Sequence, residues 1–235
     1  MWPAVLSGPL RAAFRGGFGR PRWLPLGPCP RRAASARPGS CWSCGGGLTS
    51  AAAAPRFCPG CRALQPPEPR QDLFRLMGCD HTFHVDVAQL QQRFRTLQRL
   101  LHPDYFSQRP QTERDFSEQH SSLVNKAYRT LLSPLSRGLY LLELNGVELE
   151  EGTDPEADPE FLSEIMEINE KLSEAHNDAK VEEMENFIAA KQAELIGSVS
   201  RAFDQDDFQE AKKVLAKMKY FANLEEKVKN KKIPS

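Results

Sequence analysis

The chain has 235 residues, enough for one or two domains, and its 40% hydrophobic content is enough for a core. No stretch approaches the roughly 18 consecutive apolar residues of a membrane-spanning helix, so we expect no membrane segment. The formal net charge is zero, but residues 1–67 hold nine arginines and neither lysine nor acidic residues. Subtracting those nine leaves 22 cations against 31 acidic residues in the remainder, a balance that argues against a nucleic-acid-binding body.

The first predicted element is a targeting segment at residues 1–36. It is rich in arginine, free of acidic residues and interrupted by glycine and proline, which is typical of a mitochondrial presequence. A secretory signal would need an unbroken apolar segment, and Pro3, Pro9 and Arg11 leave no room for one. The alternative is a disordered basic arm. We therefore expect import into the mitochondrial matrix, with an additional cytosolic pool left open.

Two Cys-x-x-Cys pairs follow in residues 37–64. Each pair is expected on a tight turn, where Gly45 or Gly60 permits close approach of the backbone to sulfur. Zinc suits four thiolates, because structural zinc sites are closed and tetrahedral and the metal is redox-inert. A pair of disulfides, an iron–sulfur site and redox-active thiols are the alternatives. The predicted ligands of a structural zinc ion are Cys41, Cys44, Cys58 and Cys61.

So small a module cannot fold by apolar burial, so its fold should depend on the metal. Trp42 and Phe57 could stack on bases beside Arg56 and Arg62, which keeps a zinc-ribbon nucleic-acid binder as an alternative. Two arginines, however, are few positive charges for binding a nucleic-acid backbone. A thiol oxidoreductase would need surrounding strands, and no strand pattern is present. The proline-rich residues 65–71 predict an extended linker.

A helical hairpin is predicted next. A short apolar helix ends at Gly78, and Asp86 begins a second helix with one apolar stripe and basic side chains on its other faces. Proline ends that helix within His102-Pro103-Asp104, which places a histidine and an aspartate on an exposed loop before a third, long helix. Taken alone, the tripeptide indicates only a helix stop with a capping aspartate.

Three further amphipathic helices are predicted in residues 159–232, after an acidic linker at residues 147–158. They should form a three-helix bundle. Leu162 and Met166 lie about 100–140° from Phe161 on a helical wheel, outside the main apolar stripe. They either complete the core or form an exposed apolar pair, rimmed by acidic residues, on which a partner protein docks.

The arrangement of residues 72–146 resembles a J-domain. J-domains bind the ATPase domain of DnaK-type chaperones and trigger ATP hydrolysis through the tripeptide and the basic face of the preceding helix. The chain departs from many J-domains in having Tyr105-Phe106 where they place a lysine. The resemblance implies that the chaperone-binding residues are His102, Pro103, Asp104, Arg93, Arg95 and Arg99.

The segment at residues 135–146 and the acidic helical tail resemble the HscB family (Jac1 in yeast), co-chaperones of iron–sulfur cluster assembly. The tetracysteine module resembles the animal mitochondrial form. In this family the bundle binds the iron–sulfur scaffold protein. The scaffold-binding positions implied here are Leu162, Met166, Glu167, Glu170 and Phe221.

The expected fold is therefore all-α, with a J-domain hairpin and a carboxy-terminal three-helix bundle preceded by a small four-cysteine zinc module. The resemblance implies a mitochondrial adaptor that brings the scaffold protein to a DnaK-type ATPase and promotes cluster transfer to recipient proteins. A general J-protein for unfolded clients is the alternative, although a compact acidic bundle with one small patch favours a single folded partner.

We expect neither an enzyme nor a metal site built from histidine. No Ser-His-Asp order, glycine-rich phosphate loop or helical His-x-x-x-His set is recognisable. Four histidines lack metal-ligand spacing and are expected in loops or at the surface: His81, His84, His120 and His176.

Overall fold

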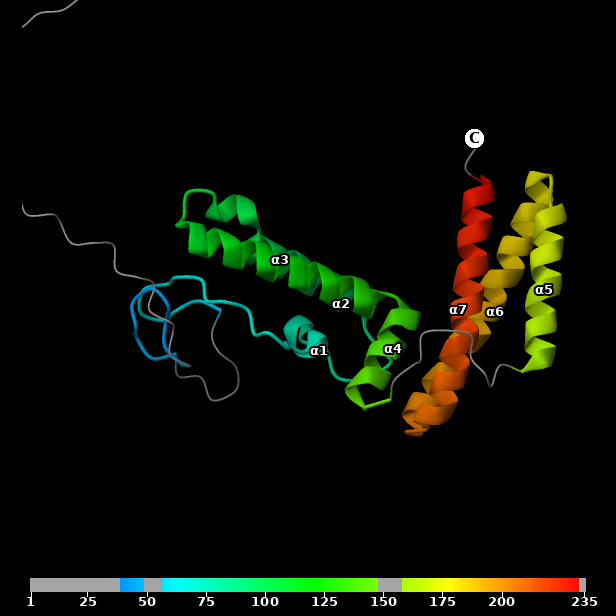
Figure 1. Cartoon of the computed structure of the whole chain (residues 1–235), viewed down its shortest axis with the longest axis horizontal. Coiled ribbons are helices and arrows are strands. Elements are labelled where there is room, and N and C mark those ends of the chain that lie inside the picture. Colours follow the sequence, from blue (N-terminus) through cyan, green and yellow to red (C-terminus); the bar gives the residue numbers. More distant parts are fainter. Residues whose placement is uncertain (1–38, 49–55, 148–157, 233–235) are drawn as a thin grey trace, which may run out of the picture.

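The computed structural model describes residues 39–48, 56–147 and 158–232 (Figure 1). Within them the regular structure is helical, with two isolated β-bridges in the tetracysteine module, so the all-α prediction is confirmed. The predicted presequence and almost all of the predicted acidic linker lie outside the described residues. No described helix is long and apolar enough to cross a membrane.

The first two helices begin and end where their capping residues predict. α1 (Leu73–Met77) starts after Asp72, whose carboxylate accepts the first backbone N–H groups, and ends at Gly78 in the left-handed conformation with φ of 68°. α2 (Val87–Leu101) is capped in the same way by Asp86. Local side-chain chemistry therefore sets these helix boundaries.

α3 (Gln111–Leu132) runs back along α2 to make the predicted hairpin (Figure 1). The Ser117 hydroxyl donates to the carbonyl of Leu101 at 2.7 Å, which satisfies a terminal acceptor of α2 beside the connecting loop. The two helices also share an apolar stripe. Its fully buried members are Leu90, Leu97, Leu101, Val124, Ala127 and Leu131.

α4 (Pro134–Leu144) turns the chain from the hairpin toward the carboxy-terminal helices. Its Arg137 is almost completely buried, and backbone carbonyls compensate its charge. The guanidinium donates to the carbonyls of Leu131 and Phe83, at 2.9 and 2.5 Å, and to that of Leu132 at 3.3 Å. A cation at the carboxyl end of α3 also interacts favourably with the helix dipole. Arg137 therefore stabilises the junction between α3 and α4.

α5 (Pro159–Glu174), α6 (Asp178–Asp204) and α7 (Phe208–Lys232) form the predicted bundle, but α5 covers only one end of the α6–α7 pair. At the other end α4 packs against α7. The result is two apolar cores. The core beneath α5 contains Phe161, Ile165, Ile168, Leu172, Ile188, Phe221, Leu224 and Val228. The other joins α6 and α7 to the hairpin through Val199, Ala202, Leu215 and Leu142.

The junction between hairpin and bundle is closely packed. A Cβ atom added at Gly138 of α4 would lie 2.6 Å from Cδ2 of Leu215 on α7, so any larger residue would force the Leu215 side chain to shift. The rings of Phe83 and Phe203 stack with centroids 5.5 Å apart. The hairpin, α4 and the adjoining end of the α6–α7 pair therefore share one core, while α5 covers a second core at the other end of that pair.

Replacing Gly138 with alanine should destabilise the protein, because Leu215 is fully buried and has little room to move. We expect a loss of about 1–3 kcal/mol in the free energy of unfolding from overpacking, offset in part by a gain of up to about 1 kcal/mol in helix propensity. Chemical denaturation measures the difference.

Gly197→Ala is the matched control. Gly197 also lies within a helix, but an added Cβ there meets nothing within 4 Å. This variant should be more stable than the wild type by about 0.5–1 kcal/mol. Equal shifts for the two substitutions would show that the junction of α4 and α7 relaxes freely.

Candidate functional site

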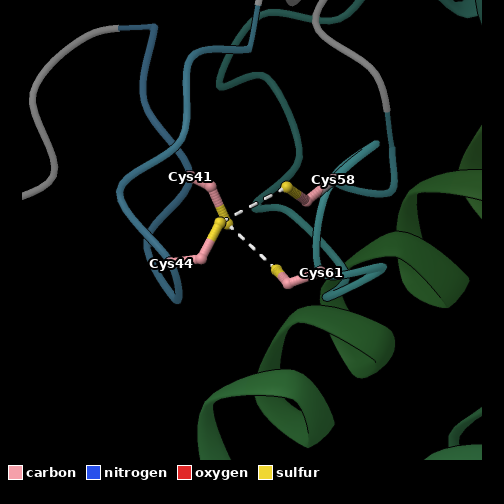
Figure 2. A group of neighbouring side chains, drawn as sticks. All are labelled: Cys41, Cys44, Cys58 and Cys61. Carbon is pink, nitrogen blue, oxygen red and sulfur yellow. Dashed lines mark hydrogen bonds between the residues drawn. The ribbon is translucent and has the colours of Figure 1, made fainter.

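The tetracysteine module brings all four predicted ligands together. Their Sγ atoms lie within 4.8 Å of one another and point inward from two opposed turns (Figure 2). The turns share one pattern of backbone hydrogen bonds. Gly45 N–H donates to the carbonyl of Cys41, and Arg62 N–H to that of Cys58, each at 2.9 Å. The module is therefore built from two metal-binding turns that have the same backbone hydrogen bond.

The two turns differ at the residue that follows the second cysteine. Gly45 has a φ of 73°, and Arg62, its counterpart, has a φ of 60°. Gly60, the glycine singled out from the sequence, lies one position before Cys61 and hydrogen-bonds through its backbone to Cys58, so it is not the counterpart of Gly45. The left-handed conformation costs a non-glycine residue about 1 kcal/mol or more. Contacts in the rest of the module therefore stabilise this conformation of the second turn.

The sulfur positions fit one tetrahedral ion. The Sγ atoms of Cys41 and Cys61 are 3.7 Å apart, as are those of Cys44 and Cys58. Metal–sulfur bonds of about 2.3 Å in a tetrahedron give a sulfur separation of about 3.8 Å. All four thiols are free, which excludes the two-disulfide alternative in this structure. The donor set therefore forms a closed, mononuclear metal site.

The thiols are electrostatically unequal. Burial opposes ionisation of Cys41, but backbone N–H groups of Cys44 and Ser43 and the neighbouring thiols outweigh it and lower the pKa to about 6. Despite a backbone hydrogen bond from Gly46, the neighbouring thiols raise the pKa of Cys44 to about 11. Several negative thiolates cannot coexist in this small space without a compensating cation, which a divalent metal supplies.

The module docks on the first half of α3. The Trp42 indole donates to the carbonyl of Leu64 at 2.6 Å and meets the ring of Phe116 edge-on, with centroids 5.8 Å apart. Gln65 is only 2% exposed, so it does not begin an extended linker as predicted. It is held because its side-chain amide approaches Cys41 Sγ at 3.3 Å while its carbonyl lies 2.8 Å from His120.

His120 was predicted in a loop or at the surface, and this was wrong. It lies in α3 with 3% exposure, beneath the module. Nε2 must donate to the Gln65 carbonyl, because a carbonyl oxygen only accepts. Burial lowers the pKa of His120, and although this hydrogen bond opposes the effect, the nearby Arg56 adds to it, so the ring is neutral.

The His-Pro-Asp tripeptide lies at the hairpin loop, as predicted. His102 caps α2, and Pro103 starts a short 3-10 helix that ends at Phe106. Nδ1 of His102 accepts from the backbone N–H of Asp104 at 3.3 Å. The Asp104 side chain is 87% exposed, while Phe106 is buried. Phe106 therefore anchors the loop and leaves the histidine and aspartate accessible.

The three arginines predicted to steer the chaperone do not share a face. Arg95 and Arg99 are exposed and lie about 40° apart on the wheel of α2, just before the tripeptide. Arg93 instead lies at the edge of the buried stripe, with its Nε atom buried close to Gly78. Two residues along a helix nearly reverse the direction of a side chain, so Arg93 does not share the exposed face of Arg95, and its contact with the chaperone stays a prediction.

The candidate scaffold-binding residues also separate. Met166 is 70% exposed, Leu162 is half-buried, and Glu167 and Glu170 are exposed. Phe221 is only 2% exposed and packs near Phe161, which argues against it as a docking residue. The sequence pattern missed the adjacent Tyr220, a half-buried ring that meets Phe161 edge-on with centroids 5.5 Å apart. The signal that could have identified Tyr220 is its position at the edge of the apolar stripe of α7, directly beside the core residue Phe221.

Comparisons with known families match the tetracysteine module and the carboxy-terminal helices. Residues 39–65 match the family described as the "Co-chaperone HscB tetracysteine metal binding motif", and residues 157–229 match the "HSCB C-terminal oligomerisation domain". The human iron–sulfur cluster co-chaperone protein HscB is 54% identical over 100% of both chains.

Solved structures of HscB proteins are also similar to this chain. The crystal structure of human HscB has a TM-score of 0.79 and 60% identity, covering 83% of this chain and 100% of that chain. The chaperone HscB from Vibrio cholerae has a TM-score of 0.62 and 30% identity, covering 68% of this chain and 96% of that one. The chain therefore belongs to the HscB family of iron–sulfur cluster co-chaperones.

Proposed function

We propose that this protein is a two-ended adaptor in iron–sulfur cluster assembly in the mitochondrial matrix. The carboxy-terminal bundle binds the scaffold protein that carries a nascent cluster. The J-domain then triggers ATP hydrolysis by a DnaK-type chaperone, which promotes release of the cluster to recipient proteins. The arginine-rich, acid-free residues 1–36 support import into mitochondria.

One observation carries this proposal. The loop between α2 and α3, with its exposed Asp104, and helix α5, which carries the exposed Met166, lie at opposite ends of the molecule and are joined by the packed contact between α4 and α7 (Figure 1). Two sites on one body hold their partners at a set separation. Such tethering raises the effective concentration of one partner near the other without requiring strong affinity at either site.

The loop is suited to triggering rather than to catalysis of a covalent step. Asp104 presents a carboxylate that accepts hydrogen bonds from a partner's arginine, and His102 is positioned by its contact with the Asp104 backbone. Proline fixes the local backbone. Stimulation then arises because the chaperone conformation that hydrolyses ATP binds this loop more tightly.

His102→Gln should reduce stimulation of the chaperone's ATPase to the basal rate, because glutamine does not reproduce the ring that contacts the Asp104 backbone. Scaffold binding should be unchanged, since the bundle is remote from the loop. His176→Gln, at the exposed turn between α5 and α6, is the matched control and should behave as wild type. Single-turnover ATPase assays and calorimetry separate the two activities; loss of both would contradict the two-site division.

The apolar pair Leu162 and Met166 on the bundle gives the opposite prediction, in which scaffold binding rather than chaperone stimulation is lost. Replacing Leu162 and Met166 with alanine should weaken scaffold binding by about tenfold or more, while basal interaction with the chaperone is retained. Phe187 is 41% exposed on α6 beside Lys191, so Phe187→Ala is the control and should bind normally. Equal loss in the control would show that general surface apolarity, rather than this patch, binds the scaffold.

Phe221→Ala should act differently from these patch substitutions. Because Phe221 is buried in the core beneath α5, truncation should lower the free energy of unfolding by about 3–5 kcal/mol. Thermal denaturation tests this. Normal stability combined with selective loss of scaffold binding would return Phe221 to the docking surface.

We propose zinc as the metal of the four-cysteine site, since a closed tetrathiolate site for one ion is typical of structural zinc. Elemental analysis should find about one zinc per chain. Cys41→Ser should lose the metal, and the fluorescence of Trp42 should change as the ring leaves Phe116, while the helical circular dichroism signal remains. Cys79→Ser, which alters a half-buried thiol outside the cluster, should keep the metal. Bound iron would contradict the assignment.

A further inference from the structure

The dipeptide Leu64-Gln65 follows the second metal-binding turn and contacts the first turn. The Trp42 indole donates to the carbonyl of Leu64 at 2.6 Å, and Nε2 of Gln65 approaches Cys41 Sγ at 3.3 Å. Gln65 also remains tied to its own turn, because its backbone N–H donates to the carbonyl of Arg56 at 2.8 Å. The dipeptide therefore links the two metal-binding turns at a position close to one of the four sulfur atoms.

The same dipeptide contacts α3 of the J-domain. Nε2 of His120 donates to the carbonyl of Gln65 at 2.8 Å, and the backbone N–H of Leu64 makes a longer contact, of 3.5 Å, with the carboxylate of Glu113. Leu64 is fully buried in the apolar core of the hairpin, and Gln65 is 2% exposed. The place of the Gln65 amide beside Cys41 is therefore set by α3 as well as by the module.

The orientation of the Gln65 amide is fixed by its neighbours. Nε2 lies 2.7 Å from the carbonyl of Ala63, which only accepts hydrogen bonds, so nitrogen rather than oxygen occupies this position. The second N–H of this nitrogen is then available to the Cys41 sulfur. Oε1, by contrast, is buried and has no hydrogen-bond partner among the described residues. An amide that leaves its acceptor unpaired needs compensation on its donor side.

A metal-bound thiolate provides that compensation. Hydrogen bonds to a charged acceptor are roughly twice as strong as those between neutral groups, whereas a neutral thiol is only a weak acceptor. The sulfur contact of Gln65 therefore stabilises the protein most when Cys41 is a metal-bound thiolate. Side chains that contact a ligand rather than the metal orient that ligand and raise the affinity for the metal.

We propose that Gln65 is a positioning residue of the metal site and that α3 of the J-domain, acting through Gln65, raises the affinity for the metal. The Gln65 amide stabilises the Cys41 thiolate, and His120 holds that amide in place. Coupling between two sites is reciprocal, so the bound metal also strengthens docking of the module on α3. This inference rests on the metal proposed above for the four-cysteine site.

Gln65→Met tests the amide in the full chain. Methionine has a similar length and no N–H, and the carbonyl of Ala63 keeps the backbone N–H of Cys58 as a donor at 2.9 Å. The variant should bind zinc about 10–100-fold more weakly in competition with a chromophoric chelator. With cobalt in place of zinc, the sulfur-to-metal charge-transfer band should shift, because the amide no longer withdraws charge from the Cys41 thiolate.

His120 gives the sharper test, because its hydrogen bond is to the Gln65 carbonyl, 55 positions away in sequence, rather than to a cysteine. His120→Leu should weaken zinc binding by about fivefold or more. His120→Gln, whose amide nitrogen replaces Nε2 as a donor, should restore most of the affinity. Ser121→Ala is the matched control and should change the affinity less than about twofold, because the buried Ser121 hydroxyl donates to Gln98 of α2, at 3.1 Å, and not to the module.

The outcomes separate the inference from the proposed metal. If His120→Leu binds zinc as tightly as Ser121→Ala, α3 does not act on the site, and the inference is overturned while the metal site stands. A weaker Gln65→Met variant with an unshifted cobalt band would overturn the sulfur contact. Combining Gln65→Met with His120→Leu should cost less than the product of the two single losses, and a full product would overturn the shared route. If the wild type binds neither zinc nor cobalt, both proposals fail.

Discussion

The contact between Gly138 and Leu215 is the constraint on which the architecture depends. It lets α4 approach α7 closely enough to replace the third helix along the half of the bundle that α5 leaves open. The J-domain and the bundle therefore have a common core rather than a flexible connection. The proposed two-ended adaptor would gain from this, because a rigid body keeps its two proposed docking sites at a fixed separation.

Much of the fold follows from local rules. Asp86 predicts where α2 starts, Gly78 predicts where α1 ends, and Phe161 to Leu172 form one apolar stripe that is buried as expected. The metal ligands also follow from spacing, because two Cys-x-x-Cys turns need only fold toward each other. These features depend on residues close in sequence, so the amino-acid sequence alone is sufficient to predict them.

The wrong predictions concern residues whose environment is set by a distant segment. His120 and Gln65 are buried because they meet across 55 positions of sequence, and neither has an apolar side chain that periodicity could reveal. Phe221 and Tyr220 are adjacent on α7, so their division between core and surface depends on where α5 lies.

The tetracysteine module covers a part of the J-domain surface that water would solvate poorly. Phe116 and His120 of α3 lie under Trp42 and Gln65. A fragment that starts at α1 would expose an aromatic ring and leave a histidine without its carbonyl partner. Such a truncated J-domain would be more prone to aggregation and more sensitive to pH than the domain within the whole chain.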